Sequence, residues 1–181
     1  MAGHPSVRER LWRAIEARLL AITTANGYEA EVRFVRRGAT DAIQLPAYPA
    51  VLILPDTDVP DSGPTSVNRH VLLFHLEVWV KEENNYAESE YPPEGVGDPP
   101  STIHQQLETV LTAVTRAMMR DPLWGGLAAH TDEQRLQYLL LDTTVAVCGS
   151  HITYEIQYRT SVEDVAVPAA NLAMTSTWMT R

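Results

Sequence analysis

The sequence has one cysteine, no long apolar run and no apolar leader, and each of these absences excludes a class of protein. Cys148 is alone among 181 residues, so no disulfide can form within the chain, and a cytosolic folding site fits. A membrane-spanning helix needs about 18 apolar residues in a row, and no stretch approaches that length. Residues 1–10 include Arg8, Glu9 and Arg10 but no apolar segment, so we expect no signal peptide.

Motifs of the common catalytic sites are also absent. The sequence holds no G-x-S-x-G, no Walker A run, no H-E-x-x-H and no C-x-x-C. Cys148 alone excludes a thiolate zinc site within one chain. Asp56-x-Asp58-x-x-Asp61 matches the start of a calcium loop, but its sixth and twelfth positions are Asp61 and Val67 where an EF-hand needs Gly and Glu. We therefore expect no enzyme activity, no cofactor and no metal, and interpret the aspartates as a solvated loop, with an ion or partner contact as the alternative.

Positive charge is scarce, and the negative excess is local. The chain has 14 Lys and Arg against 23 Asp and Glu, a net charge of −9, which argues against a general nucleic-acid-coating surface. Residues 38–100 hold eleven acids against only Arg69 and Lys81. Hydrophobic residues make up 45% and charged residues 20%, as in one globular domain.

Periodic apolar residues predict two amphipathic helices. The first spans residues 7–24, with Ser6 as its N-cap and Asn26-Gly27 as its stop. The second spans residues 101–120 and is closed by Asp121-Pro122. The first helix is rich in arginine, including Arg8, Arg13 and Arg18.

Alternating and short apolar runs predict strands at residues 31–36, 50–54, 70–81, 135–147 and 151–160. The run at 70–81 is the strongest, with an apolar face opposite a mixed face that holds His75, Glu77 and Trp79. Such a mixed face suits a subunit contact. The order of elements favours an α+β fold, in which two helices pack on one face of a mainly antiparallel sheet of about four to five strands.

The connections are rich in proline and acid. Residues 55–69 contain three prolines with Asp56, Asp58 and Asp61, and are predicted to be a loop. Residues 82–100 carry six acids and no Lys or Arg; a connection this long is usually functional or disordered. Residues 123–133 are predicted to be a turn region. We expect one domain over residues 1–162 and an extended arm over residues 163–181.

Three groups of residues leave a local alternative open. His130, Asp132 and Glu133 form a solvated turn or, alternatively, a metal or acid–base site. His75 and Glu77 share one face of a strand, and a cross-strand polar pair is the simplest interpretation. Trp12 and Trp79 are typical of packing or interface positions.

Several segments together carry a resemblance to a known family. They are the Leu45-Pro46-Ala47 segment, the strand ending Glu77-Val78-Trp79-Val80, the turn D-P-L-W-G-G-L-A at residues 121–128, and the strand I-T-Y-E-I-Q-Y-R-T at residues 152–160. Over residues 7–162 the chain resembles the tail terminator (minor tail) proteins of long-tailed bacteriophages and phage-like particles. The chain is longer than typical members, mainly through residues 55–69, 82–100 and the tail after Ser161.

The resemblance implies a structural virion protein at the head-tail junction, assembled in the host cytoplasm. Such a subunit forms a homohexameric ring that caps the tail tube, stops its polymerisation and meets the head-tail connector, while DNA passes through without specific binding. The alternatives are another neck or head-completion protein and, from a different class, a ligand-binding or enzymatic α+β domain using His130, Asp132 and Glu133.

Two hypotheses about surfaces follow. Ring formation by one subunit type needs two different patches that meet, and the basic first helix with Arg8, Arg13 and Arg18 complements the acidic middle segment. An acidic bore would repel DNA phosphates. The candidate lining residues are Glu82, Glu83, Glu88 and Glu90, or Asp56, Asp58 and Asp61.

Overall fold

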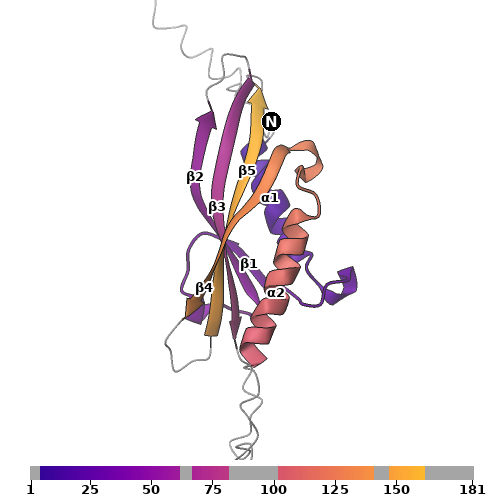
Figure 1. Ribbon diagram of the computed structural model, residues 1–181, viewed down its shortest axis with the longest axis vertical. Helices are drawn as coiled ribbons and strands as arrows, with labels where there is room; N and C mark the ends of the chain where they lie inside the picture. The colour runs from indigo at the N-terminus through magenta and orange to yellow at the C-terminus, as the bar shows by residue number, and fades with distance from the viewer. Residues whose placement is uncertain (1–4, 62–66, 82–101, 141–146, 162–181) are drawn as a thin grey trace, which may run out of the picture.

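The computed structural model describes residues 5–61, 67–81, 102–140 and 147–161, which form an α+β fold of two helices and a five-stranded sheet (Figure 1). The helices are α1 (Val7–Leu20) and α2 (Thr102–Met119). The strands are β1 (Phe34–Arg37), β2 (Ala50–Asp61), β3 (Val67–Lys81), β4 (Ala128–Leu140) and β5 (Val147–Ser161). The predicted fold class is confirmed.

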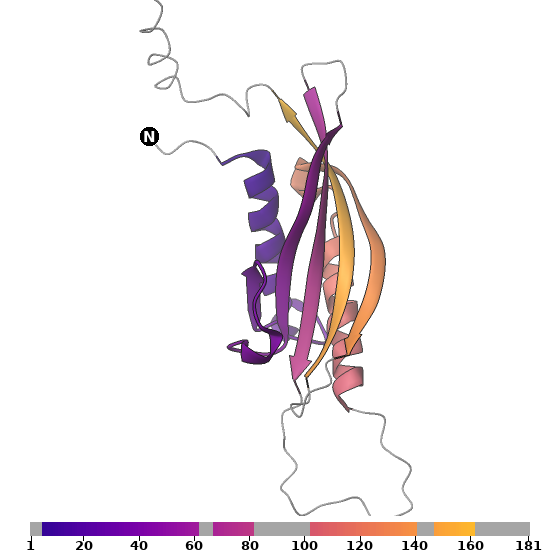
Figure 2. The same cartoon turned by 90° about the vertical axis from the view of Figure 1, so that its left-hand side faces the viewer.

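The sheet is built around one long antiparallel pair. Its strand order is β1-β2-β3-β5-β4, and only β1 and β2 run parallel. β3 pairs with β5 over its whole length, from Val67 opposite Ser161 to Lys81 opposite Val147. The long strands run along the long axis of the molecule (Figure 2). This pairing places residues far apart in the sequence side by side at every rung.

Both helices pack on one face of the sheet. Alternate residues of β3 and β5, among them Phe74 and Tyr154, are buried in one cluster with the apolar stripes of α1 and α2. Trp12 of α1 meets Phe74 edge-on, with ring centroids 5.4 Å apart. A two-layer core requires that every second strand residue is buried and that each helix turns an apolar stripe toward them, and both conditions are met here.

The prediction of a loop at residues 55–69 was wrong for residues 55–61 and 67–69, and residues 62–66 lie outside the described residues. β2 continues to Asp61, and β3 begins at Val67. β1 pairs with β2 only as far as Ile53, so beyond that point β2 is an edge strand, where prolines are tolerated, and its register against β3 shifts just after Pro55. The prolines therefore did not break the strand.

The boundaries of β4 were also predicted wrongly. A 3-10 turn at Trp124–Gly126 is followed by β4, so residues 128–133 are strand and not turn. β4 is described to Leu140, residues 141–146 lie outside the described residues, and Val147 belongs to β5. Most side chains of this edge strand are exposed, so they carry no clear apolar alternation. The first helix also ends earlier than predicted, at Leu20.

Two of the predicted segments lie outside the described residues. These are the acidic connection at residues 82–100 and the arm at 163–181. Within the described part of the chain, neither helix is long and apolar enough to cross a membrane.

Candidate functional site

The face of the sheet turned away from the helices is the candidate functional surface, and we call it the open face. Leu54, Val71 and Leu73 are half-buried there although no helix covers them. The polar side chains among them come from four strands. They include Asp56, Glu77, His75, His151, Thr153, Glu155, Gln157, Arg135 and Gln137.

One end of the open face is covered by the chain itself. The segment before β2 closes a second apolar cluster over Ala50, Leu52 and Trp79. Trp79 is only 4% exposed, and its indole N–H donates to a carboxylate oxygen of Glu77 at 3.2 Å. Packing therefore accounts for Trp79, which sequence reasoning had placed at a subunit contact.

Two histidines lie at the centre of the open face. The rings of His75 and His151 meet edge-on with centroids 4.3 Å apart. His75 Nδ1 lies 3.0 Å from the Thr153 hydroxyl, and its Nε2 lies 3.6 Å from a carboxylate oxygen of Asp56. Burial lowers the pKa of His151. The neighbouring His75 and Arg135 lower this pKa further, whereas Glu77 raises it. A proton added here therefore meets a neighbouring imidazole on a partly desolvated surface.

The predicted acidic triplet is split between the two faces. The register of β2 shifts between Pro55 and Asp58, and this bulge leaves Asp56 on the open face and turns Asp58 toward the helices. The Tyr158 hydroxyl donates to Asp58 Oδ2 at 2.8 Å, and Arg8 Nε lies 3.4 Å from the same oxygen. Asp58 thus ties the start of α1 to the sheet.

His70 completes this cluster on the helix side. Its Nδ1 lies 3.4 Å from Asp58 Oδ1 and its ring stacks on Tyr158. His70 and His75 thus lie on opposite faces, as the strand period predicted. Asp61 belongs to β2, whereas Glu82, Glu83, Glu88 and Glu90 lie outside the described residues.

The other predicted arginines of α1 also have partners within the chain. Arg13 donates to Glu9 at 3.0 Å, one turn away on the same helix. Arg18 donates to the carbonyl oxygens of Met118 and Asp121 at 3.2 and 2.9 Å. These contacts stabilise the helix layer, although the Arg8 and Arg13 side chains remain 51% and 65% exposed.

The alternative site at His130, Asp132 and Glu133 is divided as well. His130 and Asp132 are both 56% exposed and 3.8 Å apart. Glu133 accepts hydrogen bonds from Thr115 and Tyr154, on the helix side. Within the described ranges, no group of three His, Cys, Asp or Glu side chains is arranged to hold a metal ion.

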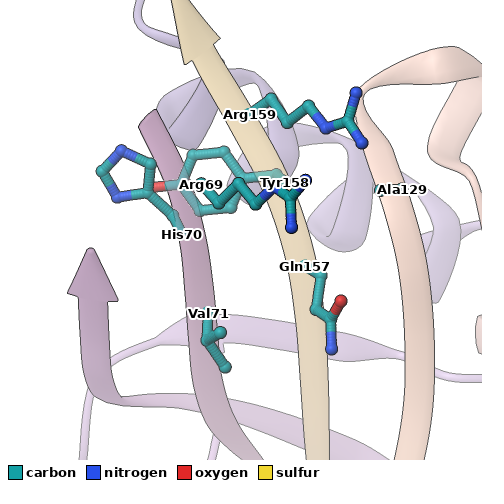
Figure 3. A pocket seen from close by; sticks show the side chains of 7 residues that line it. All are labelled: Arg69, His70, Val71, Ala129, Gln157, Tyr158 and Arg159. Carbon is teal, nitrogen blue, oxygen red and sulfur yellow. The ribbon is translucent and has the colours of Figure 1, made fainter. Parts of the chain in front are cut away.

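Sequence reasoning missed a pair of basic residues at the other end of the open face. Arg69 of β3 and Arg159 of β5 are directly opposite each other. They flank a hollow of about 180 Å³ that Gln157 and Ala129 also line (Figure 3). The signal was present in the period of the last strand, which places Arg159, Gln157 and Glu155 on one face.

Comparison of the sequence with protein-family models gave no match, and comparison with curated proteins gave none either.

Proposed function

We propose that the chain is a structural subunit of a phage tail, which forms a ring at the head-proximal end of the tail tube, ends tube polymerisation and joins the tail to the head connector. In this proposal the partners are further copies of the chain, the tail tube protein and the connector. The protein acts in the virion without enzyme activity. DNA passes through the ring without specific binding.

The open face is the observation that carries the proposal. An antiparallel sheet with one solvated face normally has polar residues on that face. Here Leu54, Val71 and Leu73 are half-buried, and Val59, also on this face, is 54% exposed. A second subunit that covers this surface would remove apolar area from water, which favours association.

The segments that carry the family resemblance have structural roles that suit such a subunit. The D-P-L-W-G-G-L-A turn joins α2 to β4 and is held by Thr131, whose hydroxyl donates to the Pro122 carbonyl at 2.7 Å and accepts from the Trp124 indole at 2.8 Å. The last quoted strand is β5, the partner of β3 over its whole length. Both segments therefore fix the sheet that presents the open face.

A ligand-binding or enzymatic function has weaker support. A wider hollow, of about 590 Å³, lies beside Arg18, Tyr28 and Asp121, but Arg18 and Asp121 already engage each other there. The histidine and acid residues of the alternative site point to two sides of β4. A neck or head-completion protein with the same fold is the second candidate function. Only the position of the protein in the virion distinguishes this candidate from a tail terminator.

The first experiment is negative-stain imaging and mass measurement of the purified full chain, alone and mixed with tail tubes. We expect rings, and rings bound at one end of each tube. A strictly monomeric protein that does not bind tube ends would contradict the proposal. Density for the chain elsewhere in the neck of the virion would favour the second candidate.

A variant of the open face sharpens this test. Leu73→Glu places a charge on the half-buried open face and should abolish rings without unfolding the subunit. Leu20→Glu is the matched control, since Leu20 is 52% exposed on α1. Equal ring yield from both variants would mean that the open face is not the contact.

A further inference from the structure

Arg69 and Arg159 form a basic rung across β3 and β5. Both side chains are exposed on the open face, and like charges directly opposite on adjacent strands repel. Among the described residues, neither guanidinium has an ion pair. Figure 3 shows the Arg69 side chain leading from β3 toward β5 and the Arg159 side chain leading from β5 toward β4. Two cations held together in this way favour an anion between them.

The hollow beside this rung comes from a bulge in β4. The register of β4 against β5 shifts between Ala128 and His130, and Ala129 lines the hollow of about 180 Å³. A bulge next to an exposed pair of donors leaves space for a small group. Asp61 is the register neighbour of Arg69 on β2, whereas the pairing of β4 ends at Tyr158 and leaves Arg159 without a neighbour on that side. The rung therefore keeps an excess of positive charge.

We propose that this hollow binds carboxylates from residues 82–100 of a second copy of the chain, a contact that rests on the proposed ring. That segment holds six acids and no Lys or Arg, and arginine recognises carboxylates in a planar two-pronged geometry. A basic rung on one copy and an acidic segment on the next are two different patches, as a closed ring of identical subunits requires.

The segment of the same copy could make this contact only in an almost fully extended form. Arg69 precedes Lys81 by twelve residues of continuous strand, a distance of about 40 Å. Glu90 follows Lys81 by nine residues and reaches at most about 32 Å from it when fully extended. The end of β3 and the start of α2 lie at the same end of the molecule (Figures 1 and 2), so acids nearer to α2 are limited in the same way. A contact within one copy would therefore need the segment and both side chains to be almost fully extended, whereas a contact from another copy would not.

A nucleic-acid phosphate fits the surroundings less well. Asp132 and Glu155 are directly opposite each other on β4 and β5, only four residues along β5 from Arg159. A phosphate backbone that continued past the basic rung would meet this pair of acids. A short peptide with spaced carboxylates can end at the hollow. Glu163 and Asp164 follow β5 in the same chain, and their occupation of the hollow is the competing outcome of the test.

Charge reversal tests the contact in the full-length protein. Arg69→Glu with Arg159→Glu should weaken self-association about tenfold or more at low salt, as measured by sedimentation velocity. Arg10→Glu with Arg36→Glu is the matched control, because these exposed arginines lie on α1 and β1. Glu88→Arg with Glu90→Arg should weaken association equally, and the variant that carries all four reversals should recover it. Unchanged association of the first variant, or no recovery in the fourfold variant, overturns the proposal.

A disulfide test identifies the occupant. Arg159→Cys with Glu90→Cys, in a Cys148→Ala background, should form cross-links between copies that were mixed from two isotope labels. Cross-links within one copy only, or a gain in association when Glu163 and Asp164 are changed to Lys, would assign the hollow to the chain's own C-terminal acids and overturn the proposal. Loss of duplex DNA retention by the Arg69 and Arg159 variant with unchanged association would assign it to phosphate, also against the proposal.

These outcomes separate the contact from the proposed function. Rings that persist after charge reversal leave the tail-ring function intact and remove the contact. Cross-links between copies in a protein that forms no ring and does not bind tube ends keep the contact and remove the tail-ring function.

Discussion

The guanidinium of Arg18 lies over the indole of Trp124, with its Cζ atom 3.7 Å from the ring centroid. The same group donates to the carbonyl oxygens of Met118 and Asp121 at the end of α2. One side chain of α1 thus satisfies carbonyls at the C-terminus of the other helix, where the helix dipole favours a cation. Trp124 is itself held by its hydrogen bond to Thr131. Arg18 of α1 therefore holds in place the turn at residues 121–128, which carries part of the family resemblance.

Arg18→Ala should lower the free energy of unfolding by about 2 kcal/mol, because a cation–π contact and hydrogen bonds to backbone carbonyls are lost together. Arg18→Lys should lie between the wild type and Arg18→Ala, since lysine keeps the charge but not the planar fork. Urea denaturation measures both. Arg10→Ala, on the exposed side of α1, is the control, and equal destabilisation by Arg10→Ala and Arg18→Ala would refute the role of Arg18.

Stability should fall at alkaline pH because of two buried phenols. Burial raises the pKa of Tyr154 and of Tyr158, and the hydrogen bonds to Glu133 and Asp58 add to the effect. A folded-state pKa above that of the unfolded chain means that the unfolded tyrosine loses its proton first, near pH 10. The stabilisation is complete below about pH 10 and declines as the pH rises further.

Urea midpoints at a series of alkaline pH values measure this decline. Tyr154→Phe with Tyr158→Phe should be less stable at neutral pH, because two hydrogen bonds are lost, but should show a shallower decline above about pH 10. Tyr138→Phe serves as the comparison for an exposed phenol, since Tyr138 is 52% exposed, although its hydrogen bond to Glu108 also raises its pKa. An unchanged slope in the double variant would show that these phenols do not govern the alkaline limit.

Acid should destabilise the centre of the open face. The pKa of His151 is lowered chiefly by burial and then by His75 and Arg135, while Glu77 opposes them, and Asp56 faces His75 from β2. The unfolded chain therefore takes up the proton first, near pH 6.5. The stabilisation is complete above that pH and is lost as the pH falls through the lower folded-state pKa.

His151→Gln should reduce the loss of stability between about pH 7.5 and about pH 5.5, as measured by thermal unfolding at both values. His130→Gln is the matched control, since His130 is 56% exposed on β4. NMR titration of the ring protons of His151 gives its pKa directly. A pKa for His151 at or above about 6.5 would contradict the prediction.

The sequence predicted best those helices and strands that have one buried face and one outward face. α2 and β3 bury one face and turn the other away, so the periods of 3.6 and 2 were visible, and their bounds differ from the prediction by at most three residues. The end of β2 was missed because prolines end strands only where the ladder needs their N–H. The start of β4 was missed because an edge strand with exposed side chains has no apolar alternation.

The candidate surface was only partly predictable for a related reason. The mixed face of residues 70–81 identified the open face, but the neighbours on β2, β4 and β5 depend on register. The bulge that separates Asp56 from Asp58 shifts the side chains without leaving a distinct sequence signal. Trp79 looked like an interface residue because the segment that covers it joins the sheet only in three dimensions.

Gly149 gives the sharpest test of packing at the covered end of the open face. It lies opposite Trp79 on β5, and a Cβ atom added there would lie 2.4 Å from Cε3 of the indole. Gly149→Ala should therefore cost about 1–3 kcal/mol of unfolding free energy, because the ring must shift within a packed cluster. Trp79→Leu removes the ring, so Gly149→Ala should cost much less in that background. Urea denaturation of the four proteins completes the cycle, and a coupling energy near zero would mean that the indole does not set the requirement for glycine.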